Sequence, residues 1–361
     1  MLLRGRGTAV DPWAALDGRD DAPVTDPRFP TLFTGLTGTS YPVRPPWRVA
    51  DVDYGVGVPD AVTPRDPGVN AADLIAEVGS GNVSFNVAGY IAITGDNLVF
   101  DRWDFTDLQV FMNGSENTTF TNCHFEIGPT YERTPVHSDA GAGGTVVFRN
   151  CYFDGTKEGA HEPIGTQYYI MRIGAAAGTT LTVEYCYFTG AWQDVITPGS
   201  GNDVTIRYNT FHNHGWDASG LSHVDIVQWQ TVPAGDYNFS FNTIYQAAAN
   251  GSGLPASLNA ATIYSGLSGT AGATNLSNNT YVGVGTTHQT ETGDNGKGLN
   301  YFVYLTADAP AAITDATVNQ NYVTADNYNG LAYPTPGDGV TGTDFVGNIN
   351  LQDGGTISAP F

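Results

Sequence analysis

Basic side chains are scarce in this chain of 361 residues. Fourteen Lys and Arg residues face 36 Asp and Glu residues, which gives a formal net charge of −22, and the lysines are only Lys157 and Lys297. Residues 1–65 hold seven arginines and eight aspartates, so almost all of the excess negative charge lies after them. Such a surface repels nucleic acid and anionic membranes, because long-range forces follow the summed charge. The composition favours neutral partners and cations.

Cysteine and long apolar runs are also scarce. The three cysteines (Cys123, Cys151 and Cys186) are odd in number and lack the close spacing of metal-binding pairs, so no disulfide framework is implied. No window is apolar enough to predict a membrane span, and the N-terminus lacks the apolar segment of an ordinary signal peptide. A start at Met1 would then predict a cytosolic protein, another export route, or release as part of a virus particle.

Turn-forming and aromatic residues are abundant instead. There are 45 Gly and 20 Pro residues, and an aromatic share of 12% argues against disorder. Only "NAADLIAEVG" at residues 70–79 favours a helix, with Asn70 as its N-cap. The sequence therefore predicts an all-β protein.

One pattern, apolar-x-x-[Cys/Asn/Trp]-x-apolar, repeats along the chain at variable intervals. Its middle position is occupied by Trp103, Cys123, Cys151, Cys186, Asn209, Asn242, Asn279 and Asn321, with weaker copies at Asn86 and Asn348. A fixed motif with variable spacing predicts a solenoid whose coils share strands and differ in a loop. Because stacked coils repeat every ~4.8 Å, we expect the asparagines to form an amide ladder and the cysteines to stack as buried thiols.

These coils, from "FTNCHF" at 120–125 to "VNQNYV" at 318–323, resemble the right-handed parallel β-helix superfamily, which includes pectate-lyase-like enzymes and phage tail spikes. The resemblance covers roughly residues 80–350 and implies a right-handed parallel β-helix (β-solenoid) of about 9–10 coils. It is specific for the fold rather than for function, since the superfamily contains lyases, glycosidases, esterases and structural shafts. Similarity to tail spikes also implies a homotrimer and a virion or extracellular location.

Residues 1–66 differ from the rest in composition and lack the repeat. We interpret them as an extended arm that docks on a virion or assembly partner, and we expect residues 1–60 to be dispensable for folding. Residues 67–80 are expected to form a helix that caps the first coil, because the open end of a solenoid is an unpaired edge. The β-helix would then occupy residues 81–361.

Candidate acid–base residues follow the repeat motifs, where the longer coils gain their extra residues. Such insertions are expected along one edge of the solenoid. The densest group lies in "FHNHGWDASGLSHVDIVQWQ" at residues 211–230. If Val224 and Ile226 face the core, Asp225 points outward, and Asp194 has the same parity one coil earlier. Two carboxylates one coil apart suit glycoside hydrolysis, with Asp225 as base or nucleophile and Asp194 as acid.

The complete candidate site is one outward-facing groove. Its catalytic candidates are Asp225, Asp194, His223, His214 and Asp217. Its substrate-binding candidates are Trp216, Trp192, Gln228, Arg172 and Tyr169, of which the tryptophans would stack on sugar rings. No resident cofactor is implied, although a lyase would need calcium held by aspartates, or one of Arg133, Arg172 and Arg207, to neutralise a uronate. The net charge favours hydrolysis of a neutral or mildly charged glycan.

Other interpretations of the same residues stay open. Asp194 and Asp225 could be strand-end residues that only bind backbone, and the tryptophans could simply pack the loops down. A metal site could be formed by His212, His214, His223 and Asp225. Two functions are therefore carried forward: a polysaccharide-binding and polysaccharide-cleaving β-helix similar to a tail-spike depolymerase, and a non-catalytic structural or adhesive β-helix of a virus particle or cell surface.

Overall fold

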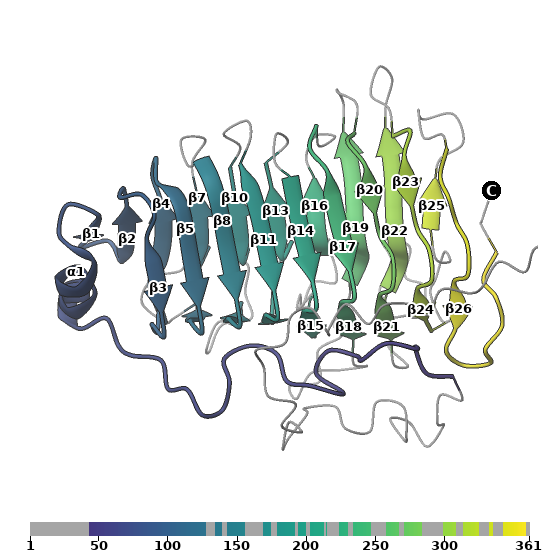
Figure 1. Ribbon diagram of the computed structural model, residues 1–361, viewed down its shortest axis with the longest axis horizontal. Coiled ribbons are helices and arrows are strands. Elements are labelled where there is room, and N and C mark those ends of the chain that lie inside the picture. The colour runs from purple at the N-terminus through teal and green to yellow at the C-terminus, as the bar shows by residue number, and fades with distance from the viewer. Residues whose placement is uncertain are drawn as a thin grey trace, which may run out of the picture.

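The computed structural model describes most of the chain after residue 42. The described residues are 43–127, 134–138, 143–155, 169–174, 179–191, 194–199, 203–212, 214, 224–229, 234–246, 258–266, 271–283, 299–307, 313–324, 332–334 and 342–358. Within them the strands form three sheets, and all paired strands run parallel except β1 and β2, which form an antiparallel pair (Figure 1).

The first sheet has ten strands. In spatial order they are β1 (Val83–Asn86), β2 (Tyr90–Ile93), β4 (Gln109–Met112), β7 (Val136–Ser138), β10 (Met171–Ile173), β13 (Ile196–Pro198), β16 (Asp225–Trp229), β19 (Leu258–Gly266), β22 (Leu299–Ala307) and β25 (Ala332–Pro334).

The second and third sheets have eight strands each. The second contains β3 (Val99–Asp101), β5 (Glu116–Thr121), β8 (Gly143–Arg149), β11 (Thr180–Glu184), β14 (Asp203–Arg207), β17 (Tyr237–Ser240), β20 (Thr274–Asn275) and β23 (Ala316–Thr317). The third contains β6 (His124–Glu126), β9 (Tyr152–Asp154), β12 (Tyr187–Thr189), β15 (Thr210–His212), β18 (Thr243–Gln246), β21 (Thr280–Gly283), β24 (Tyr322–Val323) and β26 (Ile349–Asn350).

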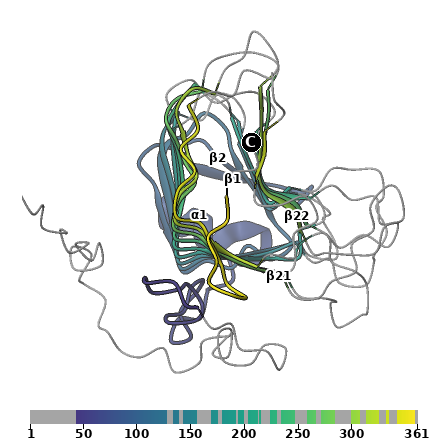
Figure 2. The ribbon, with the colours of Figure 1, turned by 90° about the vertical axis from the view of Figure 1, so that its right-hand side faces the viewer.

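Consecutive strands visit the three sheets in turn. The triplet β4–β5–β6 places one strand in each sheet, and the same order recurs through to β22–β23–β24. Each strand of one triplet pairs with its counterpart in the next. Viewed along the long axis, the sheets form the sides of one elongated body (Figure 2). This parallel arrangement is compatible with the expected β-helix, and the sheets do not close into a barrel.

The asparagine ladder predicted from the repeat is confirmed. Asn209 Nδ2 donates to Asn242 Oδ1 at 3.0 Å, and the bond recurs from Asn242 to Asn279 at 3.2 Å, from Asn279 to Asn321 at 3.1 Å and from Asn321 to Asn348 at 3.0 Å. Each acceptor oxygen also takes the backbone N–H of the preceding ladder residue. All five side chains are fully buried. The ladder therefore satisfies polar groups that would otherwise be costly inside the protein.

The predicted free thiols occupy the same position in the earlier coils. Cys123, Cys151 and Cys186 are buried and unbridged. Cys151 Sγ lies 3.6 Å from Phe120 O and 3.4 Å from Arg149 O, the equivalents of two carbonyls that the ladder amides bind. Burial raises the pKa of the Cys123 and Cys151 thiols, which disfavours the reactive thiolate. These cysteines are packing residues.

A left-handed residue precedes each ladder position from Trp103 to Asn321. Positive φ values of 54° to 62° occur at Arg102, Asn122, Asn150, Tyr185, Tyr208, Phe241, Asn278 and Gln320. Left-handed backbone costs a non-glycine residue about 1–2 kcal/mol. The ladder hydrogen bonds offset that strain at the corner where the second sheet gives way to the third.

Asn86 is not a ladder residue, contrary to the weak motif match. It lies in β1, which is antiparallel to β2, and its Nδ2 donates to the Tyr90 hydroxyl at 2.8 Å. A strand that reverses direction cannot place its residues in the parallel stack. The stacked motif positions therefore run from Trp103 to Asn348 and do not include Asn86.

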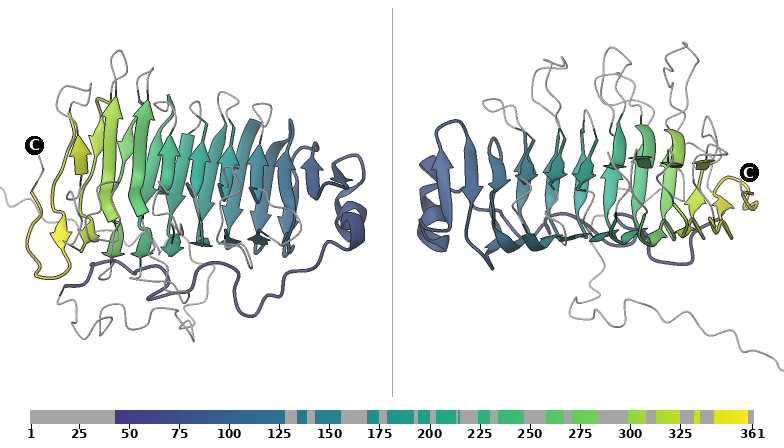
Figure 3. Two further views of the ribbon diagram at one scale, coloured as in Figure 1. Left: turned by 180° about the vertical axis from the view of Figure 1, so that it is seen from behind. Right: turned by 90° about the horizontal axis from the view of Figure 1, so that it is seen from above.

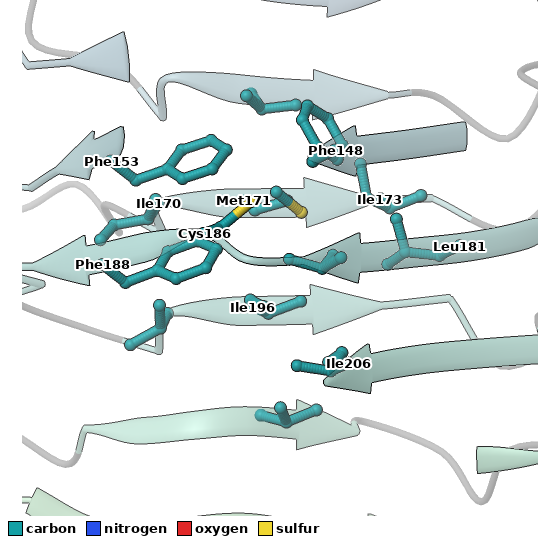
Figure 4. Packing of buried hydrophobic residues seen from close by; sticks show 14 of the residues in the cluster. Phe148, Phe153, Ile170, Met171, Ile173, Leu181, Cys186, Phe188, Ile196 and Ile206 are labelled. Carbon is teal, nitrogen blue, oxygen red and sulfur yellow. The ribbon is translucent and has the colours of Figure 1, made fainter. Parts of the chain in front are cut away.

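The core consists of like side chains stacked along the long axis. Phe125, Phe153, Phe188 and Phe211 form one stack, with successive ring centroids 4.7, 4.5 and 4.9 Å apart. Figure 4 shows Phe153 and Phe188 lying face to face, with Met171 and Cys186 beside them. Stacking of identical rings follows from the register of the parallel strands.

A short helix lies at the N-terminal end of the stack (Figure 1). It is α1 (Ala72–Val78), preceded by a 3₁₀ turn, η2 (Val69–Ala71), and its Leu74 is buried in the main core cluster. The expected N-cap role of Asn70 is wrong, because Ala71 occupies the N-cap and no side chain caps the helix. No helix among the described residues is long and apolar enough to cross a membrane.

Residues 43–57, here called the strap, run along the outside of the stack beside the third sheet (Figures 1–3). One strap cluster joins Val49 and Val52 to side chains of the later coils, namely Tyr245, Val282 and Leu351. A second cluster joins Ala50, Tyr54 and Val56 to aromatic side chains of earlier coils, namely Tyr185, Tyr187 and Tyr208. The N–H of Gly57 donates to Tyr185 O at 2.8 Å.

The described part of the arm therefore spans the stack from end to end. Val43 Cγ2 lies so close to Gly354 that a Cβ there would approach it to 2.7 Å. Near the other end, the Arg65 guanidinium lies 3.9 Å from the ring centroid of Trp103 and pairs with Glu77. This packing argues against the expectation that residues 1–60 are dispensable for folding. The arm was also expected to dock on a partner, and part of it, residues 1–42, lies outside the described residues.

Candidate functional site

The structure describes six of the ten candidate site residues. Asp217, His223, Trp216 and Trp192 lie outside the described residues. The other six are Asp194, Asp225, His214, Tyr169, Arg172 and Gln228, and five of them belong to three neighbouring coils of the first sheet.

Those three coils share a polar–apolar–apolar–polar pattern where the chain enters the first sheet. It reads Tyr-Ile-Met-Arg at 169–172, Asp-Val-Ile-Thr at 194–197 and Asp-Ile-Val-Gln at 225–228. Both apolar residues of each set are buried in the core. We call Tyr169, Asp194 and Asp225 the corner row, and Arg172, Thr197 and Gln228 the face row.

The two candidate carboxylates are adjacent but not exposed. The N–H of Asp225 donates to Asp194 Oδ1 at 3.2 Å, and the N–H of Val195 donates to Asp225 O at 2.8 Å. Asp194 is 4% exposed and Asp225 is fully buried. The expectation that both point outward is wrong, because strict alternation fails at this corner: Ile226 and Val227 are adjacent in sequence and both buried.

Tyr169 lies beside Asp194 on the preceding coil. Burial raises the pKa of its hydroxyl, the negative charge of Asp194 raises it further, and Arg172 opposes the shift. The Arg172 guanidinium lies 5.9 Å from the centre of the Tyr169 ring. Tyr169 therefore keeps its proton near neutral pH and can donate it in a hydrogen bond.

His214 is a buried structural residue rather than part of an outward groove. It is fully buried, and its Nδ1 accepts the N–H of Ala191 at 3.2 Å. Burial, with a smaller effect from His212, lowers the pKa of His214 to about 3. The His214 ring is therefore neutral at physiological pH and cannot act as a general acid in the imidazolium form.

His212 belongs to another side of the molecule. It lies on β15 of the third sheet, where its Nδ1 is 2.5 Å from the Tyr187 hydroxyl and its ring is 5.3 Å from that of Tyr245. His212 therefore lies in a different sheet from Asp225, which is on β16 of the first sheet. In the described part of the chain, no group of three or more His, Cys, Asp or Glu side chains is arranged to hold a metal ion.

Sequence reasoning overlooked Thr197, which lies between Arg172 and Gln228. Arg172 pairs in register with Thr197, and Gln228 follows Val227, the partner of Ile196. The sequence could have indicated Thr197, because each face-row residue follows its corner-row residue by three positions. Arg172 is exposed, Gln228 is half-buried and Thr197 is 5% exposed.

No family model, no curated protein and no solved structure matches the chain.

Proposed function

We propose that the chain is a right-handed parallel β-helix that binds a polysaccharide and hydrolyses it at the corner row. The observation that supports this most directly is the adjacency of Asp194 and Asp225 on neighbouring coils, joined by the 3.2 Å bond from the Asp225 N–H to Asp194 Oδ1. Glycoside hydrolysis needs two carboxyl groups, one to protonate the leaving oxygen and one to act as base or nucleophile.

The environments of the two carboxyl groups suggest a division of roles that reverses the first assignment. Asp194 accepts a backbone N–H, an interaction that stabilises the ionised form, so it suits the base or nucleophile. Asp225 is fully buried beside Asp194, and a carboxyl group in such an enclosed position suits the general acid. Tyr169 lies near the Asp194 carboxylate on the preceding coil, and its protonated hydroxyl is available as a hydrogen-bond donor there.

The test is release of reducing ends from a panel of polysaccharides. Asp194→Asn and Asp225→Asn should each lower the rate by about 10²–10⁴-fold, as expected for a general acid–base group. Asp203→Asn is the matched control, because Asp203 Oδ1 accepts the N–H of Asp236 at 2.9 Å in the same manner on the second sheet. Absence of cleavage by wild type, or equal loss in the control, would remove the hydrolase assignment. Ultraviolet absorbance of unsaturated products would identify a lyase instead.

A non-catalytic structural or adhesive β-helix is the second candidate. The observation that favours it is that Asp194 already serves the backbone of the next coil and that both carboxylates have almost no exposure. In that case Asp194→Asn should reduce stability more than Asp203→Asn, because Asp194 is buried and Asp203 is exposed, and neither variant has an activity to lose. The resemblance to tail spikes extends both candidates to a homotrimeric virion or extracellular component, which sedimentation of the purified protein would test.

A further inference from the structure

The face row presents three polar side chains whose hydrogen-bonding capacity is unused. Within the described part of the chain, Arg172, Thr197 and Gln228 make no side-chain hydrogen bond or ion pair, and Thr197 Oγ1 is buried without a partner. They stand on three adjacent strands, so the row spans about 10 Å. Buried hydroxyls without a partner also occur at Thr210, Thr243 and Thr280 of the third sheet, so Thr197 supports a ligand only together with Arg172 and Gln228.

Arg172 also differs from the other described arginines beyond residue 66. Arg102 pairs with Asp101, and Arg149 and Arg207 both pair with the buried Glu184. Arg172 is exposed, makes no hydrogen bond or ion pair in the described part of the chain, and places its guanidinium near the ring of Tyr169. In a chain of net charge −22, a cation left without a carboxylate beside a candidate site is available for a ligand.

The chemistry of the face row selects the ligand group. A guanidinium, a hydroxyl and a carboxamide can all donate, and Arg recognises carboxylate and sulfate oxygens by charge-assisted hydrogen bonds. The negative charge of Asp194, three residues before Thr197, would repel further anionic groups placed nearby. The arrangement therefore accommodates one anionic group beside the carboxylates but disfavours a polymer charged on every sugar.

The preceding coils supply a surface for a neighbouring sugar. His137 pairs in register with Arg172, and Phe111 pairs with His137. The rings of Phe111 and His137 are 5.4 Å apart and both side chains are half-buried. Ring faces of this kind pack against the apolar face of a sugar.

We propose that Arg172, Thr197 and Gln228 form an anion subsite that binds a carboxylate or sulfate carried by one sugar of the glycan. The substrate class is then a glycan with acidic groups at intervals, neither fully neutral nor a polyuronate. This inference rests on the proposed function and adds the substrate class to it.

The test is direct binding of three monosaccharide probes: methyl glucuronide, methyl glucoside and methyl glucoside 6-sulfate. With wild type, saturation-transfer NMR titrations to roughly 30 mM should show binding of at least one anionic probe and none of the neutral one, as a single charge-assisted contact in water predicts. Comparison of the glucuronide with the sulfate identifies the anion. Raising the salt concentration should weaken the signal.

Variants locate the binding. Arg172→Gln should reduce the affinity by about tenfold or more, which corresponds to one charged hydrogen bond. Arg102→Gln, which removes an arginine already paired with Asp101, should leave it unchanged. Circular dichroism melting should show both variants folded, since both arginines are exposed. Equal binding of neutral and anionic probes, no binding of any probe, or anion binding unaffected by Arg172→Gln would overturn the subsite.

The two proposals fail separately. Cleavage that depends on Asp194 and Asp225 but shows no preference for acidic glycans, together with no Arg172-dependent anion binding, would retain the hydrolase and reject the subsite. Arg172-dependent anion binding without cleavage of any polysaccharide would retain the subsite and favour the adhesive candidate.

Discussion

Asn279 is the central test of the ladder, and its replacement by alanine should destabilise the protein strongly. Its Nδ2 donates to Phe239 O at 2.9 Å, to Ser277 O at 3.2 Å and to Asn321 Oδ1, while its Oδ1 accepts both the N–H and Nδ2 of Asn242. Alanine removes all five hydrogen bonds in a fully buried position. Five groups lose a bond, but Asn242 Nδ2 still donates to Ile206 O and Asn321 Oδ1 still accepts the backbone N–H of residue 279. The three groups most affected are the Asn242 N–H and the carbonyls of Phe239 and Ser277.

The magnitude follows from the cost of leaving buried groups unsatisfied. At about 1–3 kcal/mol for each group, with partial relaxation, Asn279→Ala should lower the free energy of unfolding by about 3–6 kcal/mol. Asn279→Cys should lose less, because Cys123 and Cys151 already occupy this position with Sγ near the two equivalent carbonyls. Asn113→Ala, at an exposed asparagine, should stay within about 0.5 kcal/mol of wild type.

Urea unfolding followed by both tryptophan fluorescence and circular dichroism is the assay, since coincident curves are needed before free energies are compared. A value for Asn279→Ala within about 1 kcal/mol of wild type would show that the ladder contributes little. A cysteine variant less stable than the alanine variant would show that thiols and amides are not alternatives at this position.

Three further outcomes follow from the packing and from buried groups. A chain beginning at Val58 should be less stable than one beginning at Val43 by at least about 4 kcal/mol, because it lacks the buried Val49, Val52, Tyr54 and Val56; equal urea midpoints would show that the strap is not needed. The pKa of His214 is lowered from 6.5 to about 3, so the native state binds fewer protons than the unfolded state and stability is lost as pH falls through that window. His214→Asn, whose Oδ1 can accept the Ala191 N–H, should show a smaller difference between urea midpoints at neutral and mildly acidic pH; an unchanged pH dependence would contradict this assignment. The three buried thiols should resist labelling in native protein and react after unfolding, and fast native labelling of all three would refute their burial.

The repeated part of the fold could be predicted because a recurring local motif marks the equivalent positions of successive coils. Asn209, Asn242 and Asn279 occur in one local pattern, and a parallel stack converts that pattern into vertical neighbours. Asn86 matched the pattern but lies in an antiparallel strand, a reversal that no local motif signals. The strap could not be predicted, because its apolar residues follow no period and their partners, such as Leu351, lie far away in sequence.

The sequence predicted that Asp194 and Asp225 are adjacent, but it did not predict that both are buried. Asp194 and Asp225 were selected correctly as neighbours on adjacent coils. Their burial could not be read from alternation, because two successive core residues, such as Val195 and Ile196, mark a corner where a period of two no longer holds. His214 was grouped with them by sequence proximity, yet its side chain lies in the interior beside Phe211.

The strap imposes an order on biosynthesis. Val49 and Val52 are translated before every coil, but their cluster is complete only when Leu351 has been made. Coils can stack one after another as the chain emerges, and Tyr54 and Val56 can dock on the earlier coils, but the part of the strap around Val49 and Val52 must wait for the last coil. A nascent or truncated chain would therefore display an apolar segment that the finished protein hides. Cellular quality control could use that exposed segment to distinguish incomplete chains from complete ones.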